Sequence, residues 1–149
     1  FAELLQEGEK AFILLPGRHL LVENPFSQAP MALENFLFQL TLKDIHPIWA
    51  HPERYRYYHA RRDIYTHIHD RGILFQVNLL SLAGYYGKEV KEIAWWLGQN
   101  GWIDLLGSDL HDTRQAQAIT GWLSTSEYQR AVEMLRTLKN DLLFPSEEE

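Results

Sequence analysis

Four short apolar runs separated by amphipathic stretches set the pattern of the chain. Each run is four to six residues long and apolar almost throughout, which predicts strands buried on both faces. The runs are residues 20–23, 47–51, 73–78 and 103–107. Elsewhere apolar residues recur at helical spacing, which predicts helices over about 31–43, 60–71, 88–99, 114–123 and 126–139. Strands that alternate with helices form parallel β/α units, so the sequence predicts the α/β class.

The size of the chain limits what these units can build. Four β/α units make most of a small open sheet, or about half of a distorted, TIM-like β/α barrel. At 149 residues, 46% of them hydrophobic, the chain fits one globular domain over 1–149 that ends in a short acidic tail, 145–149. It opens at Phe1 in a segment that reads as the end of an amphipathic helix, so we expect preceding structure to be missing.

The composition of the chain limits the partners and the kinds of site that the protein can have. A net charge of −6 argues against a nucleic-acid partner. No apolar run approaches the ~20 residues of a membrane span and no secretory signal opens the chain, so we expect a cytoplasmic protein. The sequence has no cysteine, which excludes disulfides and thiolate catalysis. Any metal site must therefore use oxygen and imidazole ligands, which suit Mn, Fe, Zn or Mg.

Each predicted strand ends on, or is soon followed by, a polar residue. These residues are Glu23, His51, Asn78 and Asp109, with His111 two residues beyond the last. Sites in parallel α/β proteins form at the carboxyl ends of strands, so this succession predicts a metal site. In the alternative interpretation Glu23 and Asp109 cap the following helices and His51 packs in a turn.

Two arginines stand close to these residues. Arg54 follows His51 in a His-Pro-Glu-Arg-Tyr segment, in which proline predicts extended backbone and makes Glu53 and Arg54 diverge from the histidine. Arg114 begins the helix after Asp109. Two guanidiniums beside a metal cluster would suit a phosphate. Ser81 and the Gly84-Tyr85-Tyr86-Gly87 segment are expected to lie in turns, the two tyrosines packing on the sheet edge.

Together these segments resemble a known family. Leu20-Leu21-Val22-Glu23-Asn24-Pro25-Phe26, Ile48-Trp49-Ala50-His51-Pro52-Glu53-Arg54-Tyr55, Gln76-Val77-Asn78 and Gly107-Ser108-Asp109-Leu110-His111 with Arg114 are similar to the PHP-superfamily, manganese-dependent protein-tyrosine phosphatases of bacteria. These enzymes are linked to capsular and exopolysaccharide synthesis. The resemblance implies a distorted β/α barrel with two or three Mn ions, or Fe or Zn, at the strand ends.

The resemblance also assigns roles and partners. Glu23, His51, Asp109 and His111 are similar to metal ligands of the family, and Arg54 and Arg114 to the arginines that hold the phosphoryl group. The implied reaction is attack of a metal-activated hydroxide on phosphotyrosine. The implied partner is a phosphotyrosyl protein such as a bacterial tyrosine kinase, and a homo-oligomer is compatible with it.

The chain departs from the family at its start. The family's opening His-x-His motif does not stand on an early strand here, so we expect an N-terminally truncated piece that binds metal weakly and is inactive. Two alternatives stay open. The chain could belong to a PHP phosphoesterase that acts on a small phosphate ester, or be a non-catalytic interaction remnant whose tyrosines form a subunit contact.

Overall fold

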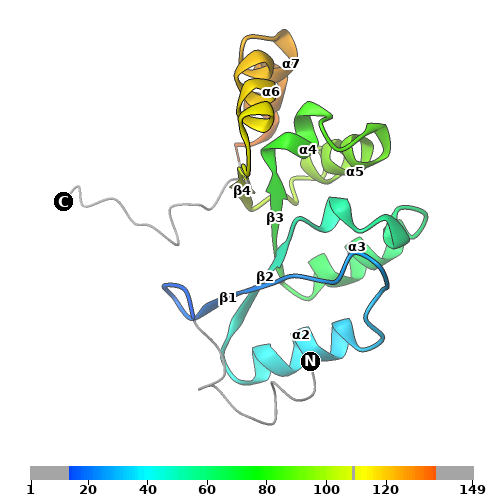
Figure 1. Cartoon of the computed structure of the whole chain (residues 1–149). Coiled ribbons are helices and arrows are strands. Elements are labelled where there is room, and N and C mark those ends of the chain that lie inside the picture. Colours follow the sequence, from blue (N-terminus) through cyan, green and yellow to red (C-terminus); the bar gives the residue numbers. More distant parts are fainter. Residues whose placement is uncertain (1–13, 109, 137–149) are drawn as a thin grey trace, which may run out of the picture.

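A four-stranded parallel sheet is the centre of the computed structural model, which describes residues 14–108 and 110–136 (Figure 1). The strands lie in the order β1-β2-β3-β4 and are β1 (His19–Val22), β2 (His46–Ala50), β3 (Leu74–Asn78) and β4 (Leu105–Gly107). The α-helices are α2 (Leu33–Leu42), α3 (Arg62–Asp70), α4 (Leu79–Ala83), α5 (Lys88–Gln99), α6 (Thr113–Leu123) and α7 (Ser126–Met134). Two 3₁₀ helices, η2 (Pro52–Arg54) and η3 (Arg56–Tyr58), follow β2.

The predicted α/β class and its parallel β/α units are confirmed. All four predicted strands form, with ends displaced by at most two residues, and α5 has the predicted bounds. Helix α4 was not predicted, because its five residues directly continue the apolar run of β3. The predicted end of the last helix, residues 137–139, and the acidic tail lie outside the described residues.

The strand register brings the carboxyl ends of the strands to one edge. Val22 pairs with Trp49, Ala50 with Gln76, and Asn78 with Gly107. Because the strands are parallel and in chain order, the residue after each strand emerges on the same side of the molecule. The polar residues that stand at successive strand ends in the sequence are therefore neighbours in space.

An aromatic core fixes β2 against its helices. Trp49 is fully buried, and four rings lie within 6 Å of it, those of Tyr55, Tyr58, Tyr65 and Phe75. Figure 1 shows α2, α3 and α5 on this side of the sheet. The buried indole donates to Asn24 Oδ1 at 3.1 Å, so its N–H is satisfied inside the core.

The opposite face of the sheet carries fewer side chains. Ile48 and Leu105 are buried there, with Leu15 and Leu74 packed against them. Leu21 on the same side remains about half exposed. Side chains along each strand therefore point alternately into a thick, helix-covered core and onto a thinner apolar face. This is the arrangement of a curved β/α sheet.

Glycines and a capping aspartate set the ends of the helices near the site. Gly84 closes α4 at φ 89° and Gly87 precedes α5 at φ 107°, so the predicted turn at 84–87 is confirmed. Asp112 caps α6 through a hydrogen bond from the Gln115 N–H. Among the residues described, no helix has the length and apolar character that crossing a membrane requires.

Candidate functional site

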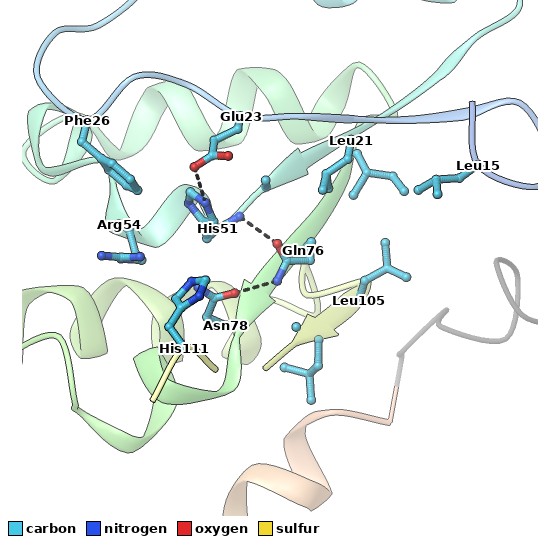
Figure 2. Close-up of a pocket in the computed structure, with 14 residues that line it drawn as sticks. Leu15, Leu21, Glu23, Phe26, His51, Arg54, Gln76, Asn78, Leu105 and His111 are labelled. Carbon is cyan, nitrogen blue, oxygen red and sulfur yellow. Dashed lines mark hydrogen bonds and ion pairs between the residues drawn. The ribbon is translucent and has the colours of Figure 1, made fainter. Parts of the chain in front are cut away.

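A cavity of about 630 Å³ opens at the carboxyl ends of the strands (Figure 2). Side chains from every strand or the loop after it line this cavity. The polar ones are Glu23, His51, Arg54, Gln76, Asn78 and His111, and Leu21, Ile48 and Leu105 form its apolar side. The structure thus brings together five of the residues that the sequence singled out: Glu23, His51, Arg54, Asn78 and His111.

Glu23 and His51 form the central contact. Glu23 Oε1 lies 3.1 Å from His51 Nε2. The carboxylate is 58% exposed, whereas the imidazole is only 8% exposed. Burial lowers the pKa of His51, and the nearby Glu23 carboxylate opposes that shift. The imidazole Nδ1 is buried, and the described residues offer it no hydrogen-bond partner. An exposed carboxylate and a buried imidazole therefore meet at one point of the cavity wall.

The backbone at His51 differs from the prediction. Proline at position 52 predicted extended geometry, but His51 has φ 34° and ψ 57°, in the left-handed region, and Pro52–Arg54 is a 3₁₀ helix. Contacts around the turn overcome the local preference, since the Tyr65 hydroxyl donates to Pro52 O and the Arg54 N–H donates to His51 O. Such a conformation in a non-glycine residue is rare and costs about 1–3 kcal/mol.

Glu53 is a buried residue that the sequence reasoning missed. Its side chain is fully buried, and its Oε2 accepts from the Asn78 N–H at 3.0 Å and from the Ser81 hydroxyl at 2.5 Å. Burial raises the pKa of Glu53 to about 7, against the lowering effect of the Ser81 hydrogen bond. Ser81 was expected in a turn, but it lies buried in α4 as the partner of this carboxyl. Glu53 therefore ties η2 to the end of β3.

Gln76 is a second residue that the sequence reasoning passed over. Its Oε1 accepts from the His51 N–H at 3.2 Å, and its Nε2 donates to Asn78 Oδ1 at 2.9 Å. Figure 2 shows this chain of contacts from His51 through Gln76 to Asn78, all three of which line the cavity. A single polar residue inside the otherwise apolar strand β3 was the available signal. The amide links the ends of β2 and β3 and supports the backbone of His51.

The other predicted site residues fall into three groups. Arg54 and His111 line the cavity, and Figure 2 shows Arg54 on the side of His51 away from Leu21 and His111 below His51. Arg114 lies exposed in the first turn of α6 and is not among the residues that line the cavity. Asp109 lies outside the described residues. Their roles stay predictions.

The donor set suits a metal ion of intermediate hardness. A carboxylate oxygen and an imidazole nitrogen converge at 3.1 Å, and a second imidazole, that of His111, lines the same cavity. Mn, Fe and Zn accept such ligands. Within residues 14–108 and 110–136, no group of three or more His, Asp or Glu side chains is close enough to hold an ion. The described residues therefore fit part of the ligand set that such a metal ion needs.

The fold and the cavity define the class: a parallel β/α protein with a carboxylate–imidazole pair and an arginine at its strand ends. The chain belongs to the CpsB/CapC family of capsular polysaccharide synthesis, whose profile matches residues 1–121. The resemblance seen in the sequence is thereby confirmed.

Three comparisons show what the chain is similar to. Tyrosine-protein phosphatase YwqE of Bacillus subtilis is 32% identical over 97 residues, 65% of this chain and 38% of YwqE. CapC of Staphylococcus aureus, named as a candidate tyrosine-protein phosphatase, is 27% identical over 95 residues, 64% of this chain and 37% of CapC.

The third comparison is with a solved structure. It comes from crystal structures of YwqE from Bacillus subtilis and CpsB from Streptococcus pneumoniae, described as unique metal-dependent tyrosine phosphatases. It matches with a TM-score of 0.70 at 26% identity, over 93% of this chain and 62% of that one. The chain thus spans less than two thirds of the length of each of these relatives.

Proposed function

We propose that the chain serves metal-dependent hydrolysis of phosphotyrosine in proteins, in the control of capsular or exopolysaccharide synthesis. The observation that carries the proposal is the Glu23–His51 contact at the strand ends, in a cavity whose wall also holds Arg54. The family and the names of its relatives support the substrate class. The absence of cysteine agrees with a reaction that has no cysteinyl-phosphate intermediate.

In this proposal Glu23, His51, Asp109 and His111 hold the metal, with Mn as the expected ion. When bound, the metal lowers the pKa of a water molecule and so supplies the nucleophile. The protein's own part is to fix its donors. Gln76 holds the backbone of His51 through Oε1, and the Glu23 carboxylate faces the imidazole. Both contacts restrict the orientation of the ligands before an ion arrives.

Arg54 is the proposed phosphate-binding group. A guanidinium presents paired N–H donors that match two phosphoryl oxygens and stays charged at any physiological pH. Arg54 stands in the cavity wall, three residues after His51 and one after the anchored Glu53. We propose the same role for Arg114, from the family resemblance alone.

The proposed partner is a phosphotyrosyl protein, such as a bacterial tyrosine kinase, in the cytoplasm. The 149 residues by themselves are expected to bind Mn²⁺ weakly and to turn over little substrate. The reason is that the described residues bring only two donors into direct contact. The activity is proposed for the protein as its gene encodes it.

The test is the activity of His51→Ala in that protein. With Mn²⁺ and a phosphotyrosyl peptide, we expect this variant to lose most turnover and to bind Mn²⁺ more weakly in calorimetry. The matched control is His67→Ala, since His67 is an exposed histidine of α3 outside the cavity. Equal turnover in wild type and His51→Ala would contradict the proposal. A panel of small phosphate esters run beside the peptide would reveal a phosphoesterase of different substrate choice.

A further inference from the structure

Four side chains form a continuous stack along the rim of the cavity. The Phe26 ring lies parallel to His51, with centroids 5.3 Å apart and 16° between the planes. The Arg54 guanidinium carbon lies 4.8 Å from the Phe26 centroid and 3.8 Å from the Tyr86 centroid. Arg54 is therefore clamped between two aromatic rings, one of which also packs on His51. Figure 2 shows Phe26 beside Arg54 and His51.

The turn between α4 and α5 places the Tyr86 ring. Gly84 and Gly87 both have positive φ, which the turn requires on each side of the two tyrosines. The Arg56 guanidinium donates to the Tyr86 carbonyl at 3.2 Å and fixes the backbone of that residue. The predicted packing of these tyrosines on the sheet edge is thus wrong for Tyr86, whose ring lies on the Arg54 guanidinium.

The clamp separates two cavities. Phe26 and Arg54 line both the main cavity and a smaller one of about 230 Å³, whose other walls are Arg56, Tyr86 and Val90. A long arginine side chain in open solvent samples many rotamers, and ordering it costs free energy when a ligand binds. Two ring faces at stacking distance attract the guanidinium and restrict its plane. The charged group, which lines the main cavity, is therefore restricted in orientation before any phosphate arrives.

We propose that Phe26 and Tyr86 are positioning residues that hold Arg54 ready to bind the phosphoryl group. The inference rests on the proposed function, because Arg54 must bind phosphate for its orientation to matter. Tyr86 is the more informative of the two, since Phe26 also touches His51. Tyr86→Leu removes the ring face, whereas Tyr86→Phe keeps it and removes only the hydroxyl.

The stack itself is tested by NMR of the 149-residue chain. Ring currents of Phe26 and Tyr86 should shift the Arg54 Nε–H proton resonance upfield. We expect Tyr86→Leu to move that resonance back toward the position of a free arginine, and Tyr86→Phe to leave it in place. Phe38→Leu is the control, because Phe38 is an exposed aromatic residue of α2 that lines neither cavity. An Arg54 resonance at the free position in the wild type would overturn the clamp.

The functional consequence is tested by kinetics of the protein as its gene encodes it, with Mn²⁺ and a phosphotyrosyl peptide. We expect Tyr86→Leu to raise KM about twofold to thirtyfold, the range for loss of one cation–π contact, with a smaller change in kcat. Tyr86→Phe and Phe38→Leu should keep the wild-type KM. In an Arg54→Lys background Tyr86→Leu should add little further loss, because both changes act on one interaction.

Two results would separate this inference from the proposed function. An unchanged KM in Tyr86→Leu, with the NMR shift lost as expected, would overturn the positioning role while leaving the phosphatase proposal intact. A wild-type KM in Arg54→Lys would overturn the proposed role of Arg54, whatever the NMR reports of the clamp. Additive losses in the double variant would show that Tyr86 acts through another group and would also overturn the inference.

Discussion

Removing the buried carboxyl of Glu53 should destabilise the fold strongly. In Glu53→Ala the Asn78 N–H and the Ser81 hydroxyl lose the acceptor that they share, at 3.0 and 2.5 Å. A buried donor without an acceptor costs about 1–3 kcal/mol. The serine hydroxyl can rotate away, whereas the backbone N–H cannot, and a small cavity remains. We therefore expect Glu53→Ala to lower the free energy of unfolding by roughly 2–5 kcal/mol.

The assay is urea denaturation followed by tryptophan fluorescence, with Glu53→Gln and Glu92→Ala measured beside Glu53→Ala. The amide oxygen of Gln accepts from both donors, so Glu53→Gln should cost less than about 1.5 kcal/mol. Glu92 is exposed on α5, and its replacement should fall within about 0.5 kcal/mol of wild type. A Glu53→Ala midpoint equal to that of Glu92→Ala would refute the anchoring role of Glu53.

Two further predictions concern packing and pH. A Cβ at Gly107 would meet Gln76 Nε2 and lie 3.2 Å from Asn78 Oδ1, so Gly107→Ala should cost about 1–3 kcal/mol in urea denaturation, and wild-type stability would refute this close approach. Burial raises the pKa of Tyr58 from 10.0 to about 12. The buried tyrosine therefore stabilises the fold below pH 10, and this stabilisation is lost as the pH rises to about 12. Tyr58→Phe should flatten that loss in denaturation series on either side of pH 10, and an unchanged slope would contradict it.

The order of elements was predictable because local patterns encode it. Buried strands of a parallel sheet are apolar on both faces, and the helices between them show one apolar stripe, so the two kinds of segment differ in the sequence itself. Helix α5 is the clearest case, with its inner residues Val90, Ile93, Ala94 and Leu97 all buried. The short helix α4 was missed because five residues after a strand, four of them apolar, are too few to show a period of their own.

The site was predictable in part, for a geometric reason. Parallel strands in chain order must bring their carboxyl ends together, so Glu23, His51 and Asn78 can be grouped from the order of the strands alone. The assignment of Arg54 to the same site followed from its place three residues after His51 in the sequence. The supporting residues gave weaker signals, because Glu53 and Gln76 act through contacts with residues about 25 positions away.

The sequence by itself determined the parallel β/α class, the candidate donors and the exclusion of thiolate chemistry, because periodicity and composition are properties of single residues and their neighbours. Only the tertiary structure decided which groups touch. In the folded chain His51, which precedes a proline, has a left-handed backbone conformation. The Glu53 carboxyl is buried and accepts a hydrogen bond from Ser81, and the Arg54 guanidinium lies between the rings of Phe26 and Tyr86. Each of these outcomes depends on long-range packing that overcomes a local backbone or solvation preference, and local preference is what a linear pattern records.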